Sequence, residues 1–272
     1  SAGLDLAQVR RAFGRAAQGY AAHAALQDEV AARLRDRLDA HPGFAPRRVL
    51  DVGCGPGTSS RALCERCGEA DFVALDFALP MLQRIDDAAM ARVCADAQAL
   101  PFADAGFDLV HSNLCLQWCD DPGLALAEFG RVLRPGGLLL FSTFGPDTLK
   151  ELRGAFAEAD GLPHVSRFVD MHDIGDALLA TGFRDPVLER DDFTLTYADL
   201  GALMRDLKAI GATNADTQRR RTLTGRARLR VEELATHSVH RDALGRGVHR
   251  GQEPDDLEAR VGAQHRERVG AV

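Results

Sequence analysis

Apolar and polar residues follow two different periods along the first two thirds of the chain. Nearly continuous apolar runs predict strands buried on both faces, at residues 49–52, 71–76, 92–97, 107–113 and 138–143. Between and after them, apolar residues recur every three or four positions, which predicts helices at 6–13, 26–38, 59–67, 80–90, 125–133, 149–158, 170–181 and 200–210. This alternation predicts an α/β fold with a mostly parallel, doubly wound sheet.

Breaks in the pattern divide the chain into four parts. Residues 1–40 form an expected N-terminal helical lid, and residues 41–145 form a core that begins after the Pro- and Gly-containing linker 41–46. Residues 146–230 are expected to form an inserted cap plus remaining core elements. Residues 231–272 belong to a tail that, from Gly211 onward, lacks aromatic residues, isoleucine, methionine and cysteine. Such a tail buries little apolar surface, so we expect it to be loosely held or disordered.

Composition narrows the class of protein. The 272 residues are 46% hydrophobic, enough for a sizeable core, and the net charge of -7 favours neither nucleic acid nor membrane as a partner. No apolar run is long enough to span a bilayer, and residues 1–11 lack the apolar centre of a signal peptide. Cys64 and Cys67 have no second pair at zinc-site spacing, so we expect reduced cysteines, a cytoplasmic location and no metal.

Three glycines carry the strongest motif. Gly53, Gly55 and Gly57 follow the apolar strand that ends near Asp51, which predicts a strand, a tight turn and a helix. The G-x-G-x-G spacing differs from the dinucleotide fingerprint, and no Lys-Ser/Thr pair of a phosphate loop follows. The motif resembles motif I of the class I S-adenosylmethionine methyltransferases, which implies a Rossmann-like fold. An NAD-dependent enzyme and a purely structural glycine turn are the alternatives.

Polar residues end the next three predicted strands. Asp76 lies 19 residues after Gly57, near the offset at which nucleotide-binding folds place a carboxylate for ribose hydroxyls. Asp96 suits the adenine amino group with Ala97 beside the ring, and Asn113 ends the following strand. Carboxyl ends of parallel strands share one edge of a sheet, so we expect these residues to lie together.

Further segments resemble a narrower family. They are Phe13 to Gln27, Ser112 to Cys119, Leu133 to Gly137, Arg167-Phe168 and Arg205 to Ala212. Together with the glycine motif they resemble the malonyl-acyl-carrier-protein O-methyltransferases of biotin synthesis, from about residue 8 to residue 229. The resemblance implies that S-adenosylmethionine is the cofactor and that the substrate is a malonyl group on acyl carrier protein, or malonyl-CoA. The residues expected to bind the cofactor are Gln27, Asp51, Gly53, Cys54, Gly55, Asp76, Phe77, Asp96, Ala97, Asn113 and Leu114.

The chemistry of a malonyl carboxylate requires alignment rather than a base, because the group is already ionised at pH 7. Tyr20 and Trp118 are candidates for a wall around the methyl group, Gln117 for orienting an oxygen, and Arg167 for pairing with the carboxylate. His23 is a candidate base if the acceptor is a hydroxyl instead. The cations expected to steer an acidic carrier protein are Arg205, Lys208 and Arg219 to Arg221.

Two alternatives stay open at this point. The same core suits a methyltransferase acting on another small acid or metabolite, and it also suits a non-catalytic S-adenosylmethionine-binding assembly factor. The tail differs from the family pattern, whose closing strand is rich in aromatic residues. We interpret residues 230–272 as a segment translated in an altered frame, which resequencing the coding DNA would test.

Overall fold

A single mixed sheet forms the centre of the molecule. The computed structural model describes residues 3–159, 164–166, 168–217 and 257–267. Among these residues, seven strands form a sheet in the order β3-β2-β1-β4-β5-β7-β6. They are β1 (Arg48–Val52), β2 (Asp71–Asp76), β3 (Met90–Cys94), β4 (Phe107–Asn113), β5 (Leu133–Phe144), β6 (Val187–Tyr197) and β7 (Leu257–Glu267). The strands from β3 to β5 are parallel and β7 is antiparallel to both neighbours, which confirms the predicted mostly parallel sheet.

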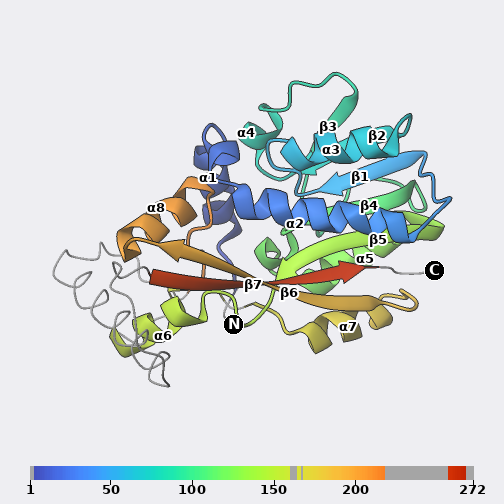
Figure 1. The fold of residues 1–272 in the computed structure, drawn as a ribbon. Coiled ribbons are helices and arrows are strands. Elements are labelled where there is room, and N and C mark those ends of the chain that lie inside the picture. Colours follow the sequence, from blue (N-terminus) through green and yellow to red (C-terminus); the bar gives the residue numbers. More distant parts are fainter. Residues whose placement is uncertain (1–2, 160–163, 167, 218–256, 268–272) are drawn as a thin grey trace.

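Helices cover both faces of this sheet (Figure 1). They are α1 (Leu6–Ala16), α2 (Ala25–Asp36), α3 (Thr58–Cys67), α4 (Leu79–Leu82), α5 (Pro122–Val132), α6 (Lys150–Ala159), α7 (Met171–Ala180) and α8 (Leu200–Ala209), with short 3-10 turns η1 (Tyr20–Ala22), η2 (Arg37–Ala40) and η3 (Leu116–Trp118). Successive residues of β1 point to opposite sides. Val49 joins the core under α2 and α3, whereas Leu50 joins the core under α5 and α7. A continuous apolar strand therefore fits its position between two helical layers.

Local signals set most helix ends. The Asp5 carboxylate accepts a hydrogen bond from the Gln8 N–H at 3.0 Å and caps α1, while Gly68, at φ +65°, ends α3. The helix predicted over 80–90 is wrong beyond Leu82. There the Asp87 carboxylate accepts a hydrogen bond from the Ala89 N–H at 2.9 Å, and this local turn leads directly into β3 at Met90.

The tail supplies a strand that the sequence did not predict. β7 lies between β5 and β6 and pairs with β6 along its whole length, from Val187–Glu267 to Tyr197–Leu257. Backbone hydrogen bonds to two existing strands require no apolar composition, which is why the pattern failed to reveal this strand. Residues 218–256 lie outside the described part of the chain, and the altered-frame interpretation stays a prediction.

The carboxyl ends of the parallel strands face a group of helices from distant parts of the sequence. Helices α1, α6 and α8 lie at the end of the sheet toward which the β1 and β6 arrows point (Figure 1). In the residues that the structure describes, no helix has the length and apolar character needed to cross a membrane. The site described below lies between these helices and the strand ends.

Candidate active site

The glycine loop after β1 folds tightly over the end of β2. The N–H groups of Gly53 and Cys54 both donate to the Leu75 carbonyl oxygen, at 2.8 and 3.0 Å. Gly53 has φ +75°, and a Cβ built on it would lie 2.6 Å from the Cys115 Sγ. Glycine is therefore required at this position for two reasons: the backbone conformation disfavours a Cβ, and Cys115 in the loop that follows β4 occupies the space a Cβ would need.

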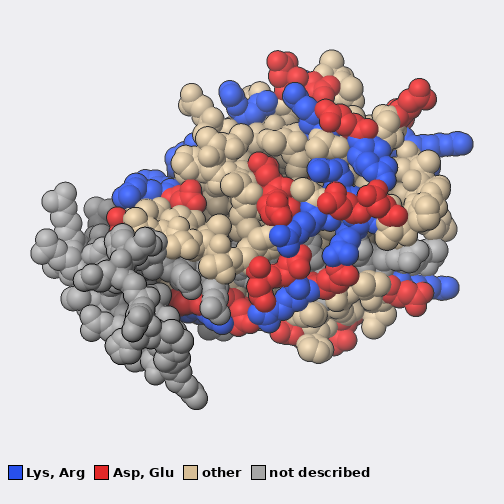
Figure 2. All heavy atoms as spheres, in the orientation of Figure 1, with Lys and Arg blue, Asp and Glu red and all other residues tan. Residues whose placement is uncertain are grey.

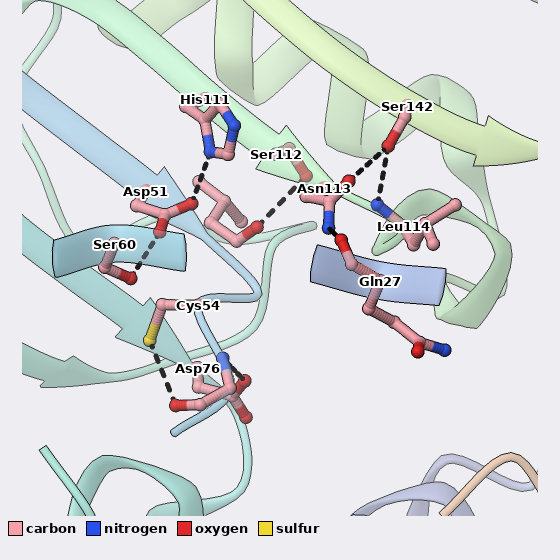
Figure 3. A network of polar contacts seen from close by, with 12 residues as sticks. Gln27, Asp51, Cys54, Ser60, Asp76, His111, Ser112, Asn113, Leu114 and Ser142 are labelled. Atoms are coloured by element: carbon pink, nitrogen blue, oxygen red, sulfur yellow. Dashed lines mark hydrogen bonds and ion pairs between the residues drawn. The ribbon is translucent and has the colours of Figure 1, made fainter. Parts of the chain in front are cut away.

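Asp51 lies behind this loop rather than in a cavity. Its Oδ2 accepts a hydrogen bond from the Ser60 hydroxyl at 2.5 Å, and its Oδ1 lies 2.8 Å from the His111 Nδ1 (Figure 3). Only 1% of Asp51 is exposed. The carboxylate thus ties the end of β1 to α3 and β4 and positions the loop, and its predicted contact with a cofactor stays a prediction.

Asp76, the last residue of β2, has a carboxylate directed at the glycine loop. Its Oδ2 accepts from the Gly55 N–H at 3.0 Å and its Oδ1 accepts from the Ala78 N–H at 2.8 Å. Burial raises the pKa of Asp76 to about 6, although both N–H donors act in the opposite direction. Each oxygen retains a second lone pair, which suits a vicinal diol.

A cleft of about 70 Å3, here called the loop cleft, lies between the glycine loop and the N-terminal segment. The predicted residues that line it are Tyr20, Gln27, Gly53, Gly55, Asp76, Phe77, Asn113, Leu114, Gln117 and Trp118. Cys54 lines a smaller adjoining hollow of about 30 Å3, together with Asp28 and Thr58. The structure therefore gathers most of the predicted site around one edge of the sheet.

Gln27 lies where the cavities meet. The Asn113 side chain donates to the Gln27 carbonyl oxygen at 3.0 Å and accepts from the Ser142 hydroxyl at 2.8 Å, which fixes α2 against β4 and β5 (Figure 3). The Gln27 Oε1 is buried and has no hydrogen-bond partner. A buried acceptor of this kind is costly unless a ligand donor completes it.

These groups fit S-adenosylmethionine. Asp76 offers acceptors for ribose hydroxyls, and Gln27 offers one for an ammonium group such as that of the methionine part. The loop cleft is nonetheless smaller than the roughly 300–1,000 Å3 of ordinary small-molecule sites. Phe13 and Tyr20 line it from the N-terminal segment, and the Phe13 ring is in edge contact with the Trp118 ring at 5.2 Å between ring centres. The segment that carries these two rings is therefore a candidate lid over the cleft.

Some predicted residues have other contacts. The Asp96 Oδ1 accepts from the Gln98 N–H at 2.9 Å, and neither Asp96 nor Ala97 lines the loop cleft, so their predicted contacts with adenine stay predictions. Gln117 donates from Nε2 to the Leu114 carbonyl at 2.7 Å and accepts from the Thr143 hydroxyl at 3.1 Å. Both ends of the Gln117 amide thus brace the loop. Arg167 lies outside the described residues, as does the cluster at 219–221.

His23 lines a second cavity, the cap chamber, of about 620 Å3 between α2, α6, β6 and α8. Its Nδ1 lies 3.1 Å from the Asp206 Oδ1, and the Tyr197 hydroxyl donates to the Asp206 Oδ2 at 2.7 Å. The cap chamber and the loop cleft share five lining residues, namely Gln27, Trp118, Phe144, Ile210 and Ala212. The two cavities therefore adjoin, with Tyr20 beside one and His23 beside the other.

Sequence reasoning did not assign Phe13, Phe144, Ile210 or Ala212 to the site. Gly211 brings the last two residues to the cleft: it has φ +77°, and a Cβ there would lie 3.0 Å from the Phe13 ring. The available signal is the family resemblance of the segment Arg205 to Ala212, which by itself does not indicate where this segment packs.

Within the described part of the chain, no group of three or more His, Cys, Asp or Glu residues is placed to hold a metal ion. All six cysteines are free thiols. The polar side chains that line the loop cleft, such as Gln27, Asp76 and Asn113, can donate or accept hydrogen bonds, which supports binding and orientation of a ligand.

Comparison with known proteins gives consistent results for sequence and fold. Residues 50–141 match the family model described as a methyltransferase domain. The YcgJ protein of Bacillus subtilis has a similar fold, with a TM-score of 0.56 and 17% identity over 87% of this chain and 98% of that chain. Phosphoethanolamine N-methyltransferase 2 of Haemonchus contortus is similar with a TM-score of 0.54 and 18% identity, over 89% of this chain and 52% of that chain. These likenesses confirm the class I methyltransferase fold.

Two relatives identify the narrower family within the methyltransferases. The malonyl-acyl-carrier-protein O-methyltransferase of Methylovorus sp. is 48% identical over 88% of this chain and 84% of its own length. The protein of the same name from Xylella fastidiosa is 53% identical over 87% of this chain and 82% of its own length. This chain therefore belongs to the malonyl-acyl-carrier-protein O-methyltransferase family.

Proposed function

We propose that the protein methylates the free carboxylate of a malonyl group carried on acyl carrier protein, an early step in biotin synthesis. The names of its relatives support this activity. The structural observation that carries it is the junction of the loop cleft with the cap chamber at Gln27 and Trp118. A cofactor at the glycine loop and an acceptor in the chamber would meet at this junction.

The reaction needs little chemistry from the protein. S-adenosylmethionine, the cofactor, supplies a methyl group on a positively charged sulfur, which leaves as the neutral thioether of S-adenosylhomocysteine. A malonyl carboxylate is ionised at neutral pH, since ordinary carboxyl pKa values lie near 4, so no residue has to act as a base. Holding the reactants in line is worth about 7–11 kcal/mol in well-oriented systems.

The residues of the site divide this task. Asp76 and Gln27 hold the cofactor by its hydroxyls and its ammonium group, and Trp118 and Phe144 wall the junction against water. The N-terminal segment that carries Phe13 and Tyr20 acts as the lid. His23 remains beside the chamber, with Asp206 orienting its ring, rather than at the reacting atoms.

The acceptor and its carrier are both anionic, so cations at the chamber would attract and hold them. Arg205 and Lys208 line the chamber on α8 and complement a carboxylate or an acidic carrier surface. On the face drawn in Figure 2, acidic and basic side chains are intermingled, so the attraction has to be local. The roles predicted for Arg167 and for residues 219–221 stay predictions, because these residues lie outside the described part of the chain. The six free thiols suit a reducing compartment, and we place the reaction in the cytoplasm.

Transfer of labelled methyl from S-adenosylmethionine tests the proposal directly. Malonyl-acyl carrier protein and malonyl-CoA are the substrates, and acetyl-acyl carrier protein is the matched control that lacks the carboxylate. Label is expected only in the malonyl thioesters, as a base-labile ester, with transfer to the carrier-bound substrate weakening as salt rises. Equal labelling of the acetyl control, or no labelling of either malonyl thioester, would contradict it.

A further inference from the structure

One part of the cap chamber, here called the dry end, is lined mainly by apolar side chains. Its wall there is a small apolar cluster formed by side chains of α6 and α8 together with Leu149 and Val165. The buried members that line the chamber are Leu149, Leu152, Phe156, Val165 and Leu203, each no more than 8% exposed. Leu195 and Leu207 pack against them from β6 and α8 and also line the chamber.

The chamber also has polar lining residues, and three of them lie beside this wall: Thr148, Ser166 and His164, whose ring stacks on Phe156 at 4.0 Å between ring centroids. His23, Tyr197 and Asp206 form one hydrogen-bonded cluster that links the lid to the cap. Gln27 lies at the junction with the loop cleft. The chamber thus offers the cations Arg205 and Lys208 for a carboxylate and a largely apolar wall for a hydrocarbon chain.

The acyl part of a malonyl thioester offers almost no hydrocarbon to that apolar wall. A single methylene separates its carboxylate from its thioester carbonyl, and the carrier arm beyond the sulfur contains amides and a hydroxyl. A chamber of about 620 Å3 is also large for a three-carbon group, since it is the size of a pocket for a drug-sized ligand. An aliphatic segment is the occupant that this wall would desolvate favourably.

We infer that the protein also methylates straight-chain ω-carboxyacyl thioesters longer than malonyl, with their methylenes in the dry end of the chamber. This inference rests on the proposed function and extends its substrate class. The reaction balances in the same way: a carboxylate oxygen forms a bond to the methyl carbon, the carbon–sulfur bond breaks, and its electron pair stays on sulfur. No proton and no further reactant are involved.

A chain-length series tests the inference on the unmodified protein. Malonyl, succinyl, glutaryl and adipyl groups on the same acyl carrier protein are compared for methyl ester formation by mass spectrometry. The KM is expected to fall by about fourfold per added methylene, the factor that corresponds to about 0.8 kcal/mol for each one buried. Methylation of malonyl alone, or a KM that rises with each methylene, would overturn the inference. Failure with malonyl itself would overturn the proposed function instead.

A substitution in the dry end provides the structural control. Leu207→Phe adds bulk to the chamber wall, whereas Leu179→Phe makes the same change on α7 at a side chain that is 58% exposed and lines neither cavity. The adipyl-to-malonyl ratio of kcat/KM is expected to fall about tenfold in Leu207→Phe, the lower range for a misfit of one methylene. Leu179→Phe should leave the ratio unchanged. Equal ratios in both variants with matching melting temperatures would place the chain outside the dry end and overturn the inference.

Discussion

Gly53→Ala is expected to weaken S-adenosylmethionine binding about 100-fold or more, since each 1.4 kcal/mol is a factor of ten. The φ of +75° costs a residue with a Cβ about 1–2 kcal/mol. The new methyl group would also lie 2.6 Å from the Cys115 Sγ, and relieving such overpacking costs about 1–3 kcal/mol more. Both costs fall on the loop that forms the floor of the cleft. Isothermal calorimetry measures the affinity.

Gly68→Ala is the matched control for this prediction. Gly68 has φ +65°, but no atom lies within 4 Å of the position that an alanine methyl group would take there, and it caps α3 away from the cleft. This variant should lose some thermal stability and keep its affinity for the cofactor. Cys115→Gly added to Gly53→Ala removes the close contact, so it should restore part of the binding. Equal losses of affinity in the Gly53 and Gly68 variants would show that the close contact is unimportant.

Asp76→Asn is expected to raise the dissociation constant for S-adenosylmethionine about 100-fold, because hydrogen bonds to a charged group contribute about 1.5–3 kcal/mol each. The carboxylate accepts from Gly55 and Ala78 at once. An amide at this position has one oxygen, so one of these N–H groups would face an NH2 donor. The substitution therefore damages both the ribose contact and the loop, and Asp76→Glu should recover part of the charge-dependent binding.

The same carboxylate sets a pH dependence. With burial raising the pKa of Asp76 to about 6, the group is ionised above that pH and protonated below it. Ribose hydroxyls donate to the ionised form, so cofactor affinity should be full at pH 7.5 and fall by up to about tenfold per pH unit below the pKa. Asp76→Asn removes the titrating group and should flatten this profile between pH 7.5 and pH 5. An unchanged profile in the variant would assign the pH dependence to another group.

The core of the fold was predictable because its signals are local. The strands around Val49, Phe72 and Leu109 are apolar runs between turn residues, and burial between two helical layers requires that composition. The short α4 was not predictable, because a helix-compatible composition continues to Met90 while the chain turns at Asp87. β7 was missed because its own composition does not indicate a strand. It is held by pairing with β5 and β6, which are distant from it in the sequence.

The site was predictable at the level of residue types at strand ends. Asp76 and Asn113 lie in the cleft as expected, because their positions follow from the parallel sheet. Asp51 and Gln117 have the right chemistry but are held by His111 and Thr143, partners that the motif could not specify. The contributions of Phe13 and Ile210 depend on how the lid and the cap fold back over the sheet, which no local pattern encodes.

The central claim is that the glycine loop and the cap chamber form one site whose reacting centre lies at their junction. A crystal structure with S-adenosylhomocysteine tests it most directly. The account predicts ribose hydroxyls on the Asp76 carboxylate and the sulfur between Gln27 and Trp118, facing the chamber. A nucleoside bound away from the loop cleft, or a sulfur turned away from the chamber, would contradict it.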